Sequence, residues 1–156
     1  MRNYIFITTI AIILTTSLVP KTVKNYLNFS EWISEFTYRA EKDGEDYWKT
    51  PEETIKDRGG DCEDFAILAV DTLRGLGYKM YLIVITHRSG GKQYGHAIAL
   101  LKHDAGFSYF SNNKYFSTRH NNLRALLNNN YPKWIDARIC NIDKQCFFKI
   151  KSKKEN

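Results

Sequence analysis

Apolar residues recur at helical spacing in the segment that follows the glycine pair Gly59 and Gly60. One face of this segment carries Phe65, Leu68, Ala69, Leu73 and Leu76. Two glycines permit a tight backbone turn, and Asp61 behind them can accept hydrogen bonds from the free N–H groups at a helix start. The pattern therefore predicts a helix with one buried face, which begins at or next to Cys62 and stops near residue 75.

Two shorter helices are predicted before this one. Ser30 precedes a run of amphipathic residues and is expected to cap a helix after a connector at 21–29. Thr50 and Glu53 have the spacing of a capping box, with Pro51 at the preferred first helical position. The second of these helices should end at the glycine pair, so that it delivers the chain into the longer helix.

Runs of aromatic and β-branched residues predict strands in the second half of the chain. Strands are expected at 78–86, 94–102 and 107–110, with an extension of the third toward 116 left open, and a small helix at 121–130 precedes mixed strand and loop at 131–148. A turn near 104–106 makes the last two strands a hairpin, so residues 111–115 should return alongside His96. This register places Asn112 or Asn113 near the imidazole.

The composition is that of a globular protein. Of 156 residues, 43% are hydrophobic and 14% are aromatic, so we expect one domain over residues 21–150. The net charge of +6 comes partly from lysines near the end of the chain, and residues 151–156 are expected to form a solvated basic tail. No basic face with a recognisable nucleic-acid-binding module is evident, so no nucleic-acid partner is expected.

The N-terminal segment 1–20 has the pattern of an export signal. An early arginine is followed by an uncharged stretch rich in Ile, Leu and Thr. As a helix its roughly 16 apolar positions would span about 24 Å, short of the ~30 Å hydrocarbon core. A cleaved signal is favoured, but residues 15–17 match a cleavage site loosely, so an uncleaved membrane anchor stays open. Both interpretations predict an exported protein that is periplasmic, secreted or anchored facing outward.

Export makes the three cysteines informative, because an oxidising compartment permits disulfides. Cys140 and Cys146 are close in sequence and could close a small loop, which would leave Cys62 as a free thiol. The two could equally be reduced. Neither this pair nor the histidines have the ligand spacing of a zinc site.

A thiol at a helix N-terminus is a candidate nucleophile, because free N–H groups and the helix dipole favour its ionised form. The dipole contributes only about 0.3–2 kcal/mol, so a basic partner such as histidine is needed. His96 is the preferred base because Gly95 before it relieves crowding and the strand after it is apolar. With Asn112 as a polar orienter, the residues follow Cys, His, carboxamide order. The alternative is a buried structural Cys62 and a structural His96.

Three ordered motifs resemble the bacterial transglutaminase-like cysteine peptidases of the papain-like superfamily. They are Trp48-Lys-Thr-Pro-Glu-Glu-Thr54, Gly59-Gly-Asp-Cys-Glu-Asp-Phe-Ala66 and Gly95-His-Ala-Ile98. The resemblance implies an α+β, papain/transglutaminase-like fold in which the nucleophile helix packs on an antiparallel sheet. It also implies a thiol peptidase or amide-bond transferase that acts on a protein or peptide through a thioester on Cys62, with His96 as base.

The third member of the triad is where the chain departs from that family. The family commonly has Asp there, whereas this chain offers Ser111, Asn112 and Asn113. Asn112 can accept the ring N–H, but it brings no negative charge to stabilise an imidazolium. This departure motivates a second hypothesis, a catalytically weak or inactive binding module of the cell envelope.

One branch of the family, the periplasmic calcium-dependent proteases that cleave adhesins, has a similar Asp-Cys-Glu-Asp motif. Its acidic residues beside the cysteine ligate calcium, which maps here to Asp61, Glu63 and Asp64. A cation bound by carboxylate oxygens would also cancel the negative charge that opposes thiolate formation. The alternative is that these carboxylates only favour the helix dipole. No other cofactor is expected.

Overall fold

The helices in the described part of the chain are α1 (Tyr26–Ser34), α2 (Pro51–Asp57), α3 (Cys62–Gly75) and α4 (Leu123–Asn130). The computed structural model describes residues 18–42 and 46–152. The predicted signal or anchor thus lies outside the described residues up to position 17, as does the tail beyond Ser152. No helix within 18–42 or 46–152 is long and apolar enough to cross a membrane.

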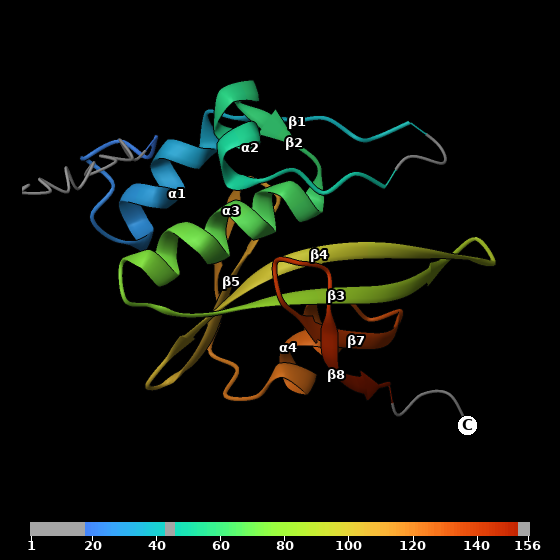
Figure 1. Ribbon diagram of the computed structural model, residues 1–156. Helices are drawn as coiled ribbons and strands as arrows, with labels where there is room; N and C mark the ends of the chain where they lie inside the picture. The colour runs from blue at the N-terminus through green and yellow to red at the C-terminus, as the bar shows by residue number, and fades with distance from the viewer. Residues whose placement is uncertain (1–17, 43–45, 153–156) are drawn as a thin grey trace, which may run out of the picture.

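The strands form two sheets. They are β1 (Thr37–Tyr38), β2 (Gly59–Gly60), β3 (Lys79–Ser89), β4 (Lys92–His103), β5 (Gly106–Ser111), β6 (Lys114–Ser117), β7 (Trp134–Cys140) and β8 (Cys146–Lys151). Strands β1 and β2 pair in parallel, while the other six form one antiparallel sheet in the order β6-β5-β4-β3-β7-β8. Helices α1, α2 and α3 lie on one side of the large sheet and α4 on the other (Figure 1). The predicted α+β arrangement, with the Cys62 helix on an antiparallel sheet, is confirmed.

The core under α3 fixes the position of this helix over the sheet. Phe65, Leu68 and Leu73 are fully buried against residues of β3 and β4. Leu76, which the helical spacing assigned to the buried face, is 41% exposed because it lies at the C-cap, where α3 ends. Burial of the apolar face stabilises the helix, so the residue at its N-terminus is held rigidly.

Helix α1 begins earlier than the sequence pattern predicts. Asn25 is the N-cap, and its side chain accepts hydrogen bonds from the N–H groups of Leu27 and Asn28 at 3.0 and 2.9 Å. The predicted cap, Ser30, lies inside the helix. An asparagine cap satisfies the same free N–H groups that a serine would, so the prediction failed on position and not on chemistry.

The chain turns into α3 at Arg58 and not at the glycines. Arg58 caps α2 in a left-handed conformation with φ 47°. Gly59 and Gly60 are needed for space instead: a Cβ on Gly59 would collide with the carbonyl oxygen of Thr37, and one on Gly60 with the carboxylate of Asp64. The expected glycine turn is therefore wrong, and the glycines permit close packing of β2 against β1 and α3.

The segment predicted as a third strand, with its extension toward residue 116, forms two strands that pair as a hairpin. Strand β5 ends at Ser111, and β6 returns along it with Ser111 opposite Lys114. Asn112 occupies the turn with a left-handed φ of 52°, a conformation that asparagine tolerates better than most residues. This turn decides which side chain faces His96.

Candidate active site

Cys62 is the first residue of α3, as predicted, and a reciprocal capping box anchors it. The Asp61 side chain accepts from the N–H of Asp64 at 3.4 Å, and the Asp64 side chain accepts from the N–H of Asp61 at 3.2 Å. The Lys49 N–H donates to the second Asp64 oxygen at 2.8 Å. Asp64 is thus engaged by backbone donors, which holds the segment before Cys62 in place.

The thiol of Cys62 is half-buried, and its Sγ donates a hydrogen bond to Glu63 Oε2 at 2.9 Å. Burial, and then this bond to a carboxylate, raise the pKa of the thiol to about 12. A hydrogen bond from the backbone N–H of Ala97 opposes that rise in pKa. Without further positive charge, the thiol is therefore protonated near neutral pH.

His96 lies on β4, and its Nε2 is 2.8 Å from the hydroxyl oxygen of Ser111. The imidazole also contacts the ring of Tyr131, with the ring centroids 5.7 Å apart. Burial, reinforced by His87, lowers the pKa of His96, so the ring is neutral at physiological pH. In the tautomer in which Nε2–H donates to the Ser111 hydroxyl, Nδ1 carries no proton and can accept one.

Asn112, the predicted orienter, is next to Ser111 but makes no hydrogen bond to His96. Its Oδ1 is buried and has no hydrogen-bond partner among the described residues. The neighbouring Asn113 amide donates to the carbonyl oxygens of Ser34 and Phe36 at 3.4 and 2.9 Å, which ties the turn to the end of α1. Sequence reasoning found the right turn but missed Ser111 as the contact.

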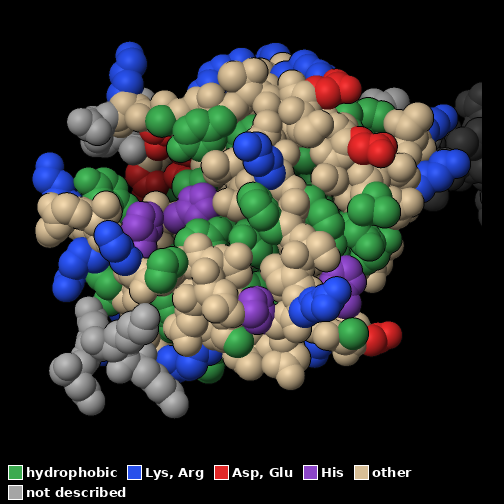
Figure 2. All heavy atoms as spheres, turned by 180° about the vertical axis from the view of Figure 1, so that it is seen from behind, with side chains coloured by type: hydrophobic (Ala, Val, Ile, Leu, Met, Phe, Trp, Pro, Cys, Tyr) green, Lys and Arg blue, Asp and Glu red, His purple; other side chains and the backbone are tan. Residues whose placement is uncertain are grey.

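One cleft of about 380 Å³ brings Cys62 and His96 together. Its lining residues are Asp46, Trp48, Cys62, Glu63, Val84, Gly95, His96, Ala97, Arg138, Lys144 and Cys146. Seen from behind, histidine side chains lie beside a set-back group of acidic side chains (Figure 2). The two residues predicted as nucleophile and base therefore share one solvent-accessible space, though the thiol hydrogen bond goes to Glu63.

Three carboxylates near the thiol could hold a metal ion. Glu41, Asp61 and Glu63 each offer an oxygen, and these oxygens lie within 4.8 Å of one another. Burial, followed by the charges of Glu63 and Asp64, raises the pKa of Asp61 to about 7. Such crowded oxygen ligands suit a hard cation such as calcium. Of the predicted ligands, Asp61 and Glu63 belong to this group, whereas Glu41 takes the place expected for Asp64.

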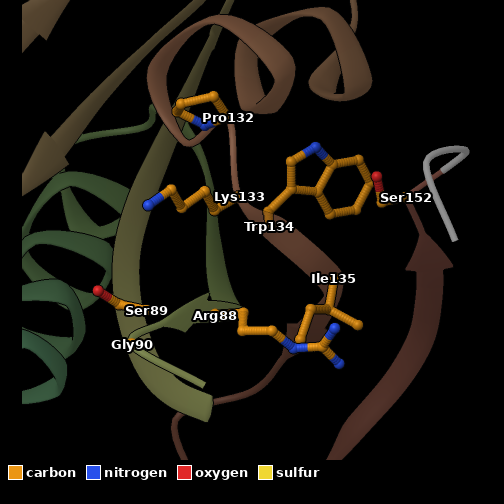
Figure 3. A pocket seen from close by; sticks show the side chains of 8 residues that line it. All are labelled: Arg88, Ser89, Gly90, Pro132, Lys133, Trp134, Ile135 and Ser152. Carbon is orange, nitrogen blue, oxygen red and sulfur yellow. The ribbon is translucent and has the colours of Figure 1, made fainter. Parts of the chain in front are cut away.

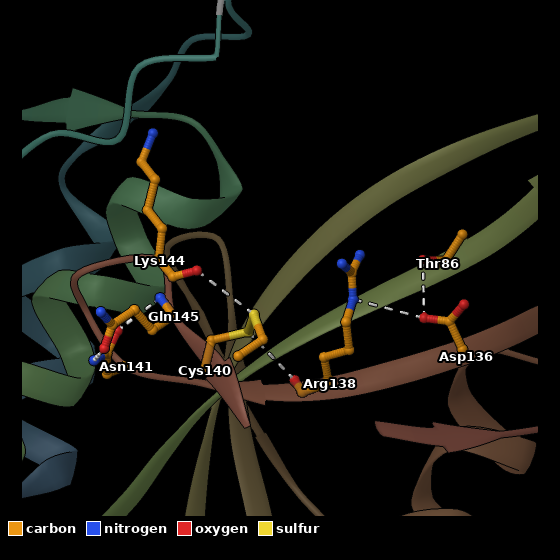
Figure 4. The surroundings of a disulfide bond; sticks show 8 residues. Thr86, Asp136, Arg138, Cys140, Asn141, Lys144 and Gln145 are labelled. Atoms are coloured by element: carbon orange, nitrogen blue, oxygen red, sulfur yellow. Dashed lines mark hydrogen bonds and ion pairs between the residues drawn. A yellow bond between two sulfur atoms is a disulfide. The ribbon is translucent and has the colours of Figure 1, made fainter. Parts of the chain in front are cut away.

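A disulfide lies at the edge of the cleft, where Cys146 is one of the lining residues. Cys140 and Cys146 are joined, with their Cα atoms 3.9 Å apart, so Cys62 is the free thiol of the three cysteines (Figure 4). The bond closes the loop between β7 and β8. Lys144 in this loop lies over the Trp48 ring, 4.9 Å from its centroid, and donates to the Asp46 carbonyl oxygen at 3.1 Å. The disulfide loop is thereby fixed against the segment before α2.

A second pocket, of about 340 Å³, lies beside the turn between β3 and β4 and the start of β7 (Figure 3). Its lining residues are Arg88, Ser89, Gly90, Pro132, Lys133, Trp134, Ile135 and Ser152. None of the predicted site residues is among them. The predicted nucleophile and base therefore lie in the cleft at Cys62 and not in this second pocket.

A comparison of the sequence with known families identifies the family of this chain. A family model described as a transglutaminase-like domain matches residues 7–134, which is most of the chain. The chain belongs to the transglutaminase-like family. The match includes Cys62, His96 and Ser111, and the α3-on-sheet arrangement is thus a transglutaminase-like, papain-type fold. No curated protein sequence matches the chain significantly.

Solved structures of LapG from Legionella pneumophila share the fold. The calcium-bound form is 19% identical, with a TM-score of 0.50, over 80% of this chain and 62% of the LapG chain. The EGTA-treated form is also 19% identical, with a TM-score of 0.50, over 82% of this chain and 66% of LapG. This transglutaminase-like chain therefore spans less than two thirds of the length of LapG.

Proposed function

We propose that this transglutaminase-like protein is an exported thiol peptidase, or amide-bond transferase, that acts on a protein or peptide through a thioester on Cys62. The observation that carries the proposal is the free thiol at the start of α3, in one cleft with His96. Export rests on the pattern of residues 1–20. Family membership supports the thiol chemistry and leaves open whether water or an amine receives the acyl group.

In the proposed reaction, Nδ1 of His96 takes the thiol proton, and the Cys62 sulfur attacks the carbonyl carbon of the substrate amide. The carbon–sulfur bond forms and the carbon–nitrogen bond breaks, and the amine leaves with the proton from the imidazolium. Water, or a second amine, then attacks the thioester and restores the thiol. The backbone N–H of Cys62, in the first turn of α3, has no acceptor within the helix and would bind the developing oxyanion.

We infer that Ser111, in place of the predicted Asn112, orients the base. Its hydroxyl contacts Nε2 of His96 at 2.8 Å, which fixes the ring with Nδ1 directed away from β5. A hydroxyl can accept the ring N–H but carries no charge, so it stabilises an imidazolium less than a carboxylate does. Asn112 in turn would hold the backbone of the turn in its left-handed conformation.

We further propose that Glu41, Asp61 and Glu63 bind calcium. The support is the crowding of their oxygens within 4.8 Å and the raised pKa of Asp61, which is caused by burial and then by the charges of Glu63 and Asp64. A LapG structure is calcium-bound, which is consistent with such a site. A bound cation supplies positive charge that favours the Cys62 thiolate. When Glu63 serves as a ligand, its carboxylate no longer holds the thiol proton.

A second candidate function is a binding module on the same fold. Two observations favour it: the pKa of Cys62 near 12 and the uncharged contact to His96. Under this function the thiol would titrate alone, and substrates would bind the cleft without turnover. The two functions therefore differ in whether His96 controls the reactivity of Cys62.

The deciding experiment measures the alkylation rate of Cys62 by iodoacetamide against pH, with calcium and with a chelator. Cys62 alone reacts because the other two cysteines are joined. We expect calcium to make the thiol react well below its ordinary pKa of about 8.5, and His96→Ala to remove that reactivity. Cys62→Ala should abolish cleavage of a protein substrate.

A matched control is His103→Ala. His103 also lies on β4 and contacts a serine hydroxyl, that of Ser108 at 2.6 Å, but it is absent from the residues lining the cleft. It should leave the alkylation profile unchanged. Identical profiles for the wild type and His96→Ala, in folded samples, would refute the catalytic pair and favour the binding module.

A further inference from the structure

We propose that Arg138 and Lys144 form an anion-binding subsite in the cleft, which receives an acidic side chain of the peptide substrate next to the reacting amide. The inference rests on the proposed function, since it names the substrate class of the same site. Both residues line the cleft that contains Cys62 and His96. Both side chains rise from the same side of the β7–β8 hairpin (Figure 4).

The sheet register places Arg138 beside the nucleophile. Arg138 is opposite Val84 on β3, and Val84 is opposite Ala97 on β4. Directly paired residues of an antiparallel sheet share a face, so these three side chains form one row across the sheet. The N–H of Ala97 bonds to the Cys62 sulfur at the end of this row. A substrate whose carbonyl reaches Cys62 therefore occupies the same cleft as Arg138.

Arg138 has few partners of its own. Its Nε is 3.7 Å from Asp136 Oδ1, and this buried nitrogen makes no hydrogen bond among the described residues. Asp136 is satisfied elsewhere, because Thr86 donates to Oδ1 at 3.2 Å and Lys149 pairs with Oδ2 at 3.2 Å. The Arg138 side chain as a whole is 42% exposed, so the outer part of its guanidinium can bind a carboxylate with two parallel hydrogen bonds.

Lys144 supplies a second positive charge at a fixed position. Its ammonium lies over the Trp48 ring and donates to the backbone carbonyl of Asp46, and within residues 18–42 and 46–152 it forms no ion pair with a carboxylate. The disulfide at Cys146 holds the loop. A lysine held in this way loses little freedom when a substrate carboxylate binds.

The acidic residues of the cleft do not neutralise these two cations. The Asp46 carboxylate accepts from the Trp48 indole at 2.9 Å. Glu63 accepts from the Cys62 thiol and belongs to the carboxylate group with Glu41 and Asp61. The carboxylate group of Glu41, Asp61 and Glu63 thus lies at the α3 end of the cleft. At the β7–β8 end, Arg138 and Lys144 lie with Asp46 as the one acidic lining residue beside them in the described part of the chain, which leaves net positive charge there.

The test compares the alkylation of Cys62 by anionic iodoacetate with that by neutral iodoacetamide. Both reagents attack the same thiolate, so the ratio of their rates is independent of the thiolate fraction. We expect Arg138→Gln to lower this ratio about three-fold or more, with a further fall in the double variant with Lys144→Gln. High salt should shrink the difference. Wild-type midpoints in urea unfolding would show that the variants remain folded.

The control is Lys92→Gln, which removes an exposed positive charge at the start of β4 outside the cleft. The ratio should stay at the wild-type value. An equal ratio for the wild type and the double variant would overturn the subsite.

A second measurement separates the subsite from the proposed function. A proteome-derived peptide mixture is incubated with the protein and calcium, and the cut sites are identified by mass spectrometry. Enrichment of Asp and Glu within a few residues of the cut, lost in the double variant, is the expected result. Cleavage without this enrichment would overturn the subsite. No cleavage, together with the expected reagent ratio, would support an anion subsite and count against the peptidase.

Discussion

The carboxylate of Glu63 accepts the hydrogen bond of the Cys62 thiol, with Oε2 2.9 Å from Sγ. The same side chain offers an oxygen to the group that contains Asp61 and Glu41. Glu63 therefore connects the ionisation of the Cys62 thiol to the charge of the carboxylate group. Occupation of that group by a cation and protonation of the thiol are expected to oppose each other.

Replacement of Glu63 by Gln should make Cys62 more reactive in the presence of a chelator. The substitution removes a negative charge and keeps a neutral hydrogen-bond acceptor, so the pKa of the thiol should fall. We expect the iodoacetamide rate at fixed pH to rise about tenfold, equivalent to one pH unit. Glu52→Gln on α2 removes an exposed carboxylate away from the thiol and serves as control. A slower or unchanged rate in Glu63→Gln would contradict this account of the raised pKa.

Asp61 should make the metal-free protein less stable as pH rises. Burial and its acidic neighbours raise its pKa to about 7 in the folded state, above the unfolded value near 4. The folded state therefore binds this proton more tightly, and the stability it confers is lost as pH increases from about 4 through 7. Urea unfolding at several pH values should show this slope, and calcium should restore stability at the upper end.

Asp61→Asn isolates the charge in that experiment. Asparagine caps a helix as well as aspartate does, so α3 should keep its N-cap while the carboxylate is lost. The pH slope should flatten and the stabilisation by calcium should shrink. Asp104→Asn, which alters an exposed carboxylate in the turn between β4 and β5, should behave like the wild type. Equal slopes in the wild type and Asp61→Asn would rule out Asp61 as the cause.

Ser111→Ala should reduce the His96-dependent reactivity of Cys62. Loss of the hydroxyl removes one hydrogen bond from the imidazole, and about 1.4 kcal/mol corresponds to a tenfold lower rate. Ser111→Asp should instead raise the pKa of His96, because a carboxylate stabilises the imidazolium. The pH profile of alkylation and the NMR titration of the His96 ring measure both effects.

Asn112→Gly is the matched variant for the neighbouring position. Glycine tolerates the left-handed φ of 52°, so the turn should survive while the amide is lost. Wild-type reactivity of Asn112→Gly beside impaired Ser111→Ala would assign the orienting contact to the serine. The reverse result would return that role to Asn112.

Local signals in the sequence were enough to place Cys62 at a helix start and His96 on a strand. The capping box at Thr50 and Glu53 and the acidic cap at Asp61 both form as the residue types predict. Cys62 consequently opens α3, and His96 lies on the neighbouring strand. These features depend on residues a few positions apart, where backbone geometry leaves few alternatives.

The rest of the site depends on contacts between distant segments. Ser111, the last residue of β5, contacts His96, whereas the prediction placed Asn112 there. Asn112 already belongs to the turn after β5. A shift of one residue along a strand moves a side chain to the other face of the sheet, so this difference changes the contact. Glu41 reaches the carboxylate group from an irregular segment with no periodic pattern. Lys144 enters the cleft through the disulfide loop, whose pairing the sequence left open.

Removal of the disulfide should weaken substrate binding in the cleft more than it lowers kcat. Cys140 and Cys146 are separated by six positions, and closure of so short a loop stabilises the folded state by about 2 kcal/mol. The double variant Cys140→Ala/Cys146→Ala should lower the free energy of unfolding by about that amount, measured in urea.

Because the loop positions Lys144 over Trp48, KM for a protein substrate should rise while kcat changes little. Mild reduction of the wild type should reproduce both effects and leave the variant unaltered. A loss confined to kcat would instead place the loop in the chemical step.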